Sequence, residues 1–105
     1  MLTHAMTTFV LLMTFSFTAH AENYEVGQLN KSFTKSVLTI KVGDTVSFKN
    51  KDSFFHNVYS LSDTQFFDLG SYPKGESRDV TFETAGKVEV ECAIHPTMKM
   101  VINVK

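Results

Sequence analysis

Apolar and polar residues alternate along most of the chain after Ser36, and this period of two constrains the fold more than any other feature. The clearest run is Val88 to Cys92, in which every second residue is apolar and both residues between them are glutamates. Successive side chains of a β-strand point to opposite faces, so the pattern is typical of a strand with one buried face. No segment keeps a helical period over several turns. We therefore expect an all-β chain.

Turn residues divide the alternating pattern into short segments. Gly43-Asp44 separates residues 38–42 from residues 46–48, and we expect these two segments to pair as a β-hairpin. Further strands are expected at residues 24–33, where Gly27 interrupts the pattern, and at 57–61, 78–82, 88–92 and 100–104. Several short strands separated by turn residues favour an antiparallel β-sandwich or barrel.

One stretch in the middle of the chain lacks the alternating pattern. Residues 62–75 contain Pro73, two glycines and the Phe66-Phe67 pair, which is the composition of an irregular connection rather than of a strand. We expect any helix in the chain to be confined to this stretch.

The first 21 residues have the composition of a secretory signal peptide. Residues 9–17 form an apolar stretch that is too short to span a bilayer, and Ala19-His20-Ala21 offers a small-x-small cleavage site. The segment contains no Lys or Arg, and an uncleaved anchor is the alternative; it would also leave the rest of the chain outside the cytoplasm. We expect export to the periplasm and one mature domain of residues 22–105.

Charge and cysteine content narrow the classes of function. All 10 basic and 11 acidic residues lie in residues 22–105, and the net charge of −1 carries no long run of either sign. This balance gives no basis for nucleic-acid or anionic-membrane binding. The one cysteine, Cys92, cannot form an internal disulfide in an oxidising compartment. It is therefore a free thiol, an intermolecular bridge or a metal ligand.

Three potential metal donors follow one another at the end of the clearest strand. Cys92, His95 and Met98 are spaced by three, so a short loop could bend them around one point. His56 is the only other histidine in residues 22–105. Soft sulfur ligands with imidazole favour copper, and two histidines, one cysteine and a weak axial methionine form a type 1 blue-copper site.

Each donor also has a structural interpretation. Cys92 could be a small buried apolar residue, and His56 and His95 could be ordinary loop histidines. Met100 is in phase with the apolar face of residues 100–104, so we expect it to fill the core, whereas Met98 precedes that strand and is the better axial ligand. The joint placement of the one cysteine and both histidines favours a metal site.

The same residues resemble the cupredoxins, the family that includes plastocyanin, pseudoazurin and amicyanin. The resemblance covers residues 36–105 and rests on five short motifs: Val-Gly-Asp-Thr-Val at 42–46, His-Asn-Val at 56–58, Lys-Gly-Glu-Ser at 74–77, Ala-Gly at 85–86, and Cys-x-x-His at 92–95. The Cys-x-x-His-x-x-Met spacing, with proline after the histidine, is similar to the short ligand loop of amicyanin. The resemblance implies a Greek-key β-sandwich with one type 1 copper per chain, bound by His56, Cys92, His95 and axial Met98.

Two departures from the family pattern stand out. Many members have Ser or Thr after the cysteine, where this chain has Ala93, so a side-chain hydrogen bond that ties the two ligand loops is missing. We expect Asn57 to compensate through backbone groups. The region after Ala21 is also shorter than a typical member, which predicts a reduced outer strand or a reduced 62–75 loop.

The resemblance implies a monomeric one-electron carrier. It places His95 near the surface among apolar residues as the exit for the electron, for which Phe54, Phe55, Ile94 and Pro96 are candidates. A c-type cytochrome or a periplasmic amine-oxidising dehydrogenase is the implied redox partner. The alternatives are copper delivery or buffering, and a plain interaction domain with Cys92 as a core thiol. We do not expect an enzyme, because residues 22–105 hold no histidine beyond the two proposed ligands.

Overall fold

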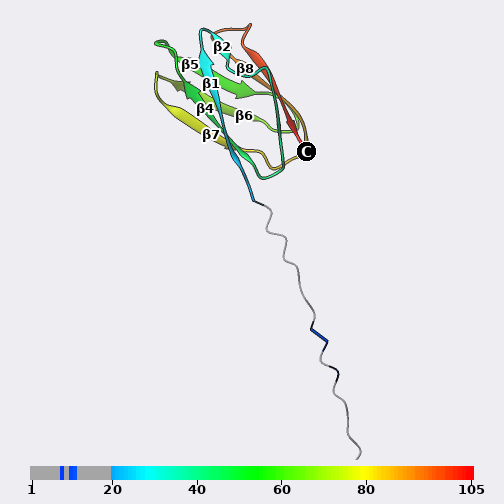
Figure 1. Cartoon of the computed structure of the whole chain (residues 1–105). Coiled ribbons are helices and arrows are strands. Elements are labelled where there is room, and N and C mark those ends of the chain that lie inside the picture. The colour runs from blue at the N-terminus through cyan, green and yellow to red at the C-terminus, as the bar shows by residue number, and fades with distance from the viewer. Residues whose placement is uncertain (1–7, 9, 12–19) are drawn as a thin grey trace, which may run out of the picture.

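A computed structural model describes residues 8, 10, 11 and 20–105 of the chain, and residues 23–104 fold into a two-layer β-structure (Figure 1). The described residues contain no helix. The strands are β1 (Asn23–Leu29), β2 (Ser32–Phe33), β3 (Val37–Ile40), β4 (Thr45–Asn50), β5 (His56–Ser60), β6 (Phe67–Tyr72), β7 (Ser77–Thr81), β8 (Gly86–Cys92) and β9 (Lys99–Val104). The all-β sandwich predicted from the alternating pattern is confirmed.

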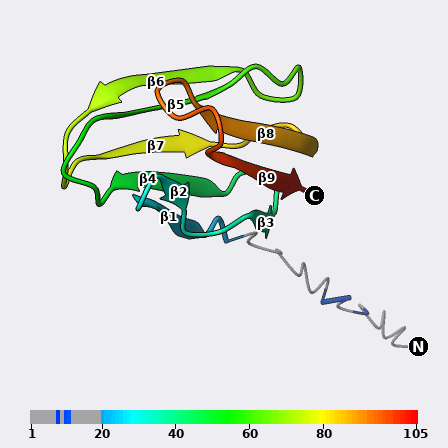
Figure 2. The ribbon, with the colours of Figure 1, turned by 90° about the horizontal axis from the view of Figure 1, so that it is seen from above.

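Two sheets form the sandwich (Figure 2). One has the strand order β2-β1-β4-β7, and the other has the order β3-β9-β8-β5-β6. The chain passes between the sheets four times from β3 onward, so that strands distant in sequence become neighbours, as Greek-key connections require. Most pairs are antiparallel, but β1 pairs with β4 and β3 pairs with β9 in parallel. The sheets are therefore mixed rather than wholly antiparallel.

The predicted hairpin on either side of Gly43-Asp44 is wrong. Strand β3 pairs with β9, while β4 pairs with β1 and β7, so the two segments belong to different sheets. Gly43 adopts a φ of 95°, a conformation that suits glycine, and the turn carries the chain from one sheet to the other. Both segments bury one apolar face in the same core, each from its own sheet. Their sequences therefore show the same alternation that two strands of a hairpin would show.

Strand β6 lies inside the stretch that we expected to be irregular. Phe67 and Tyr72 are both buried although they are five residues apart, which a strict period of two would forbid. The pairing of β5 with β6 shifts register between Asn57 and Tyr59, and Gly70 opposite this shift has a φ of 69°. This β-bulge lets Phe67 and Tyr72 face the same side of the sheet. It also interrupts the alternation of apolar and polar residues, so the sequence pattern does not indicate a strand here.

The expected first strand at residues 24–33 is two strands with a tight turn between them. Strand β1 continues through Gly27, and the chain instead turns at Asn30 and Lys31, which both have left-handed φ values of 54° and 57°. The turn brings β2 back beside β1 in antiparallel pairing.

The core lies between the sheets and draws on both of them, and it includes the predicted inward faces of β8 and β9. Val88, Val90 and Cys92 are buried, and so are Met100, Ile102 and Val104. Burying one large apolar side chain stabilises the fold by about 1.5 to 3 kcal/mol relative to exposure. This packing holds the end of β8 in place beside the start of β5.

Candidate metal centre

Sheet register brings the first two donors together. Strand β5 pairs with β8 so that Val58 lies opposite Cys92, and His56 is two residues before Val58 on the same inward face. The His56 side chain is fully buried and Cys92 is 1% exposed. Because residues two apart in a strand share a face, this register points the imidazole and the thiol into the same space.

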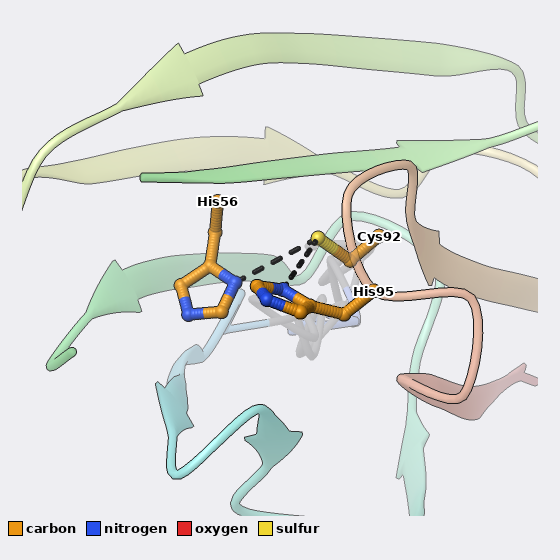
Figure 3. A group of neighbouring side chains, drawn as sticks. All are labelled: His56, Cys92 and His95. Atoms are coloured by element: carbon orange, nitrogen blue, oxygen red, sulfur yellow. Dashed lines mark hydrogen bonds between the residues drawn. The ribbon is translucent and has the colours of Figure 1, made fainter. Parts of the chain in front are cut away.

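A short loop after β8 supplies the third donor. The Met98 N–H donates to the His95 carbonyl at 2.9 Å, and the Cys92 N–H donates to the Met98 carbonyl at 3.3 Å. These bonds fold the loop back on itself and bring the half-buried His95 ring next to the Cys92 sulfur (Figure 3). Cys92 Sγ lies 3.7 Å from His56 Nδ1 and 3.9 Å from His95 Nδ1.

The three donor atoms have the spacing that one metal ion requires. All lie within 4.8 Å of one another, and they form the only such cluster of histidine, cysteine or acidic side chains found among the described residues. Protein sites bind zinc at roughly 2.0 Å from imidazole nitrogen and 2.3 Å from thiolate sulfur, so an ion of this size with trigonal ligands would separate nitrogen and sulfur by about 3.7 Å. The two sulfur–nitrogen distances match that value. One thiolate and two imidazoles are a donor set that suits copper.

The register of β8 and β9 distinguishes the two methionines. Met100 lies opposite Val90, and the same register continued by two residues puts Met98 opposite Cys92. Directly opposed residues of an antiparallel pair have Cβ atoms about 4.5 to 5.5 Å apart, whereas diagonal neighbours are farther away. Both side chains are buried, at 1% and 2% exposure. The side chain of Met98 thus starts from a position nearer to Cys92 than that of Met100 does.

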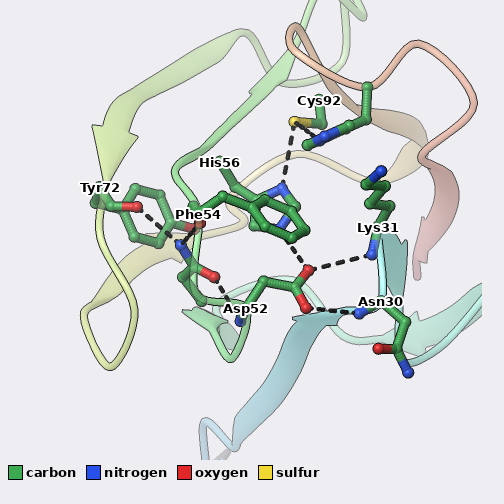
Figure 4. A network of polar contacts seen from close by, with 9 residues as sticks. Asn30, Lys31, Asp52, Phe54, His56, Tyr72 and Cys92 are labelled. Atoms are coloured by element: carbon green, nitrogen blue, oxygen red, sulfur yellow. Dashed lines mark hydrogen bonds and ion pairs between the residues drawn. The ribbon is translucent and has the colours of Figure 1, made fainter.

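A buried carboxylate that sequence reasoning missed lies behind His56. Asp52 Oδ2 is 2.7 Å from His56 Nε2, on the side of the ring that faces away from Cys92 (Figure 4). The carboxylate also accepts the backbone N–H groups of Asn30 at 2.7 Å and Lys31 at 3.1 Å. Burial is the largest influence and opposes ionisation, but the bonds from His56, Lys31 and Asn30 outweigh it and hold the pKa of Asp52 below its ordinary value.

The loop before β5 adds aromatic and apolar groups around the two histidines. The Phe54 ring centroid lies 5.1 Å from that of His56 and 5.3 Å from that of His95, and Lys31 Nζ is 5.8 Å from the Phe54 centroid. Phe54, Phe55 and Ile94 are 36%, 54% and 51% exposed, and Pro96 is exposed as well. Burial lowers the pKa of His95, and repulsion from His56 and Lys31 lowers it further. These influences favour the neutral imidazole that metal binding needs.

The two ligand-bearing loops are joined through backbone groups, as expected from Ala93. The Ala93 N–H donates to the Asn57 carbonyl at 3.1 Å, so the predicted role of Asn57 is confirmed. Among the described residues, the buried side-chain oxygen of Asn57 is one of few polar atoms without a hydrogen-bond partner. The backbone bond between Ala93 and Asn57 therefore joins the two loops without a hydroxyl at position 93. The side-chain amide oxygen of Asn57 is left without a partner.

Known proteins share both the sequence and the fold. A family model for copper-binding proteins of the plastocyanin/azurin family matches residues 20–105. The methylamine utilization protein MauL of Methylorubrum extorquens is 32% identical over 94 residues, which make up 89% of this chain and 82% of MauL. No helix in the described part of the chain is long and apolar enough to cross a membrane.

Solved structures of copper proteins have a similar fold. An amicyanin variant in its Cu(I) form superposes with a TM-score of 0.73 at 25% identity, covering 77% of this chain and 80% of that one. The copper-containing nitrite reductase of Thermus scotoductus superposes with a TM-score of 0.73 at 28% identity, covering 91% of this chain but 25% of the reductase. The chain therefore belongs to the plastocyanin/azurin family of copper-binding proteins, the cupredoxins, and its metal is copper.

Proposed function

We propose that this protein is a one-electron carrier whose type 1 copper is held by His56, Cys92 and His95, with Met98 as the weak axial ligand. The observation that carries the proposal is the spacing of the three donors, which the fold alone brings to 3.7 and 3.9 Å around Cys92 Sγ. Bound copper supplies a Cu(I)/Cu(II) couple. The protein fixes the donors so that they move little when the charge changes.

Each donor is restrained by its own part of the sandwich. Cys92 ends a strand that is paired on both sides, and coordination would displace its proton to leave the thiolate. His56 is held by Asp52, and His95 by the short loop that Met98 closes. Because these restraints come from backbone pairing and buried hydrogen bonds, the site is rigid before a metal arrives.

The surface above the site fits brief contact with another redox protein. His95 is half-buried and lies among the exposed side chains of Phe54, Ile94 and Pro96. Transient electron-transfer interfaces are small, below about 1,200 Å² in total, so a patch of this kind is sufficient. We propose a c-type cytochrome or an amine-oxidising dehydrogenase as partner, and the methylamine utilization name of the MauL relative supports that choice.

Export of residues 22–105 as the mature domain is part of the proposal. Most of the predicted signal peptide, residues 1–21, lies outside the described residues. Strand β1 begins at Asn23, the second residue after the expected cleavage point, so removal of the leader would cost the sandwich no strand. The periplasm would supply the redox partners named above.

Burial of the site favours electron carriage over copper delivery. His56 and Cys92 are almost inaccessible, whereas a protein that hands its metal to another must expose ligands to exchange. A carrier should therefore lose copper slowly to a chelator in both oxidation states. Fast release from both states would favour delivery instead.

The absorption spectrum of the purified mature protein tests the copper site. On addition of Cu(II) we expect an intense visible band from thiolate-to-copper charge transfer. The near-isosteric C92S variant keeps the shape of the site and removes the sulfur, so it should stay colourless. A colourless wild-type protein with copper bound would contradict the proposed ligand set.

A further inference from the structure

Among the described residues, Asp52 is the only acidic or basic side chain outside the ligand set that a hydrogen bond or ion pair joins to a proposed ligand. Its side chain is 6% exposed, and it meets His56 Nε2 at 2.7 Å. The opposite ring nitrogen, Nδ1, faces Cys92 Sγ at 3.7 Å. The imidazole of His56 thus lies between a carboxylate and the proposed copper position (Figure 4).

Hydrogen-bond chemistry assigns the proton on His56. An ionised carboxylate only accepts hydrogen bonds, and Asp52 already accepts the N–H groups of Asn30 and Lys31. The ring nitrogen that meets Asp52 must therefore carry the proton. A neutral imidazole has one protonated nitrogen, which leaves Nδ1 with its lone pair directed at the metal position.

The buried charge should also act on the metal. Charges in a poorly solvated interior interact more strongly than charges in water, and one imidazole ring separates Asp52 from the copper position. A fixed negative charge stabilises the more positive metal state. Outer groups of this kind orient a ligating histidine and raise its basicity.

We propose that Asp52 is a positioning residue of the copper site, which selects the tautomer of His56 that binds through Nδ1 and biases the copper toward Cu(II). The inference rests on the proposed role of His56 as a ligand. It also makes the turn at Asn30 and Lys31 part of the site. That turn, with two left-handed residues, is held by the same carboxylate that orients His56.

Asp44 offers a matched control for substitutions of Asp52. Both are buried aspartates that accept two backbone N–H groups: Asp44 those of Glu22 at 2.9 Å and Lys41 at 2.8 Å. They flank the two ends of β4, whose six residues span roughly 20 Å, so Asp44 is remote from the site. A D44N variant therefore loses a buried turn-holding carboxylate without touching a ligand.

The reduction potential of copper-loaded D52N, D44N and wild-type protein tests the effect of the charge. We expect D52N to favour Cu(I) about tenfold more than the wild type, which raises the potential of a one-electron couple by about 59 mV. D44N should keep the wild-type potential. Equal potentials in D52N and wild type, or an equal shift in D44N, would overturn the electrostatic part of the proposal.

The tautomer is read in the wild-type protein, so the test does not depend on the folding of a variant. Imidazole ¹⁵N chemical shifts of His56 in the Cu(I) and metal-free proteins should show a protonated Nε2 and an unprotonated Nδ1. In D52A, the metal-free protein should show a mixture of both tautomers. A protonated Nδ1 in the metal-free wild type would refute the proposed role of Asp52. Failure of the proposed function is a separate result, namely a wild type that binds copper without colour.

Discussion

At the scale of single residues, Met98 and Met100 offer the same thioether from different positions. Met98 lies opposite Cys92, whereas Met100 lies opposite Val90, one layer deeper in the core. We expect M98L to raise the reduction potential and alter the visible band, because a thioether donor is replaced by a hydrocarbon.

The matched variant is M100L, which makes the same chemical change in the core. It should keep the spectrum and the potential of the wild type, and lower the free energy of unfolding by less than about 1.5 kcal/mol. Visible spectra and potentials of both variants decide the assignment. A change confined to M100L would make Met100 the axial ligand.

The metal donors can be predicted from the sequence, whereas the carboxylate that holds His56 cannot. Cys92, His56 and His95 are rare residue types in this chain, so their pairing at one point can be inferred from spacing and count. Asp52 is one of many acidic residues, and its backbone partners at Asn30 and Lys31 lie about 20 residues earlier in the chain. Its role follows from the fold, which brings that turn against the loop before β5.

At the scale of elements, alternation identifies the buried face of a strand but not its neighbour. Residues 38–40 and 46–48 show their inward faces correctly, yet they pair with β9 and with β1 and β7 rather than with each other. Strand β6 escaped detection because its bulge breaks the period between Phe67 and Tyr72. Partner choice and bulges depend on contacts between distant segments, which a local pattern does not contain.

The turn between β3 and β4 allows a test of whether its left-handed backbone requires glycine. Gly43 has a φ of 95°, and a methyl group added there would meet no atom within 4 Å. Any loss of stability in G43A therefore comes from the backbone, and we expect about 1 to 2 kcal/mol in the free energy of unfolding. Chemical denaturation of the metal-free protein measures it.

Asparagine tolerates left-handed backbone better than alanine does, so G43N should lose less stability than G43A. The copper spectrum of both variants should match the wild type, because this turn adjoins Asp44 at the end of β4 remote from the site. If G43A were as stable as the wild type, a side chain at position 43 would not strain the turn, and the prediction would be wrong.

At the scale of the whole molecule, acid should destabilise the sandwich, and part of this effect should come from Asp44 at the end remote from copper. The N–H groups of Glu22 and then Lys41 hold the pKa of Asp44 below its ordinary value. A carboxyl with a depressed pKa in the folded state stabilises the fold above its unfolded pKa of about 3.9, and this contribution is lost as the pH falls through the folded pKa.

We therefore expect the free energy of unfolding of the metal-free protein to fall below about pH 4. The loss should be shallower in D44N, which has no carboxyl to protonate at this position. Denaturation curves at a series of pH values compare the two slopes. Parallel slopes would mean that Asp44 contributes nothing to the acid response.

Strand β5 meets β8 in a single register, with Val58 opposite Cys92. A slip of one residue would turn His56 outward, because neighbouring side chains of a strand face opposite ways. The two donors come from segments 36 residues apart in the chain. The blue colour that we propose would thus report that β5 and β8 have paired in the native register. It could be seen in a cell extract, and a molecule with the strands in another register would lack it.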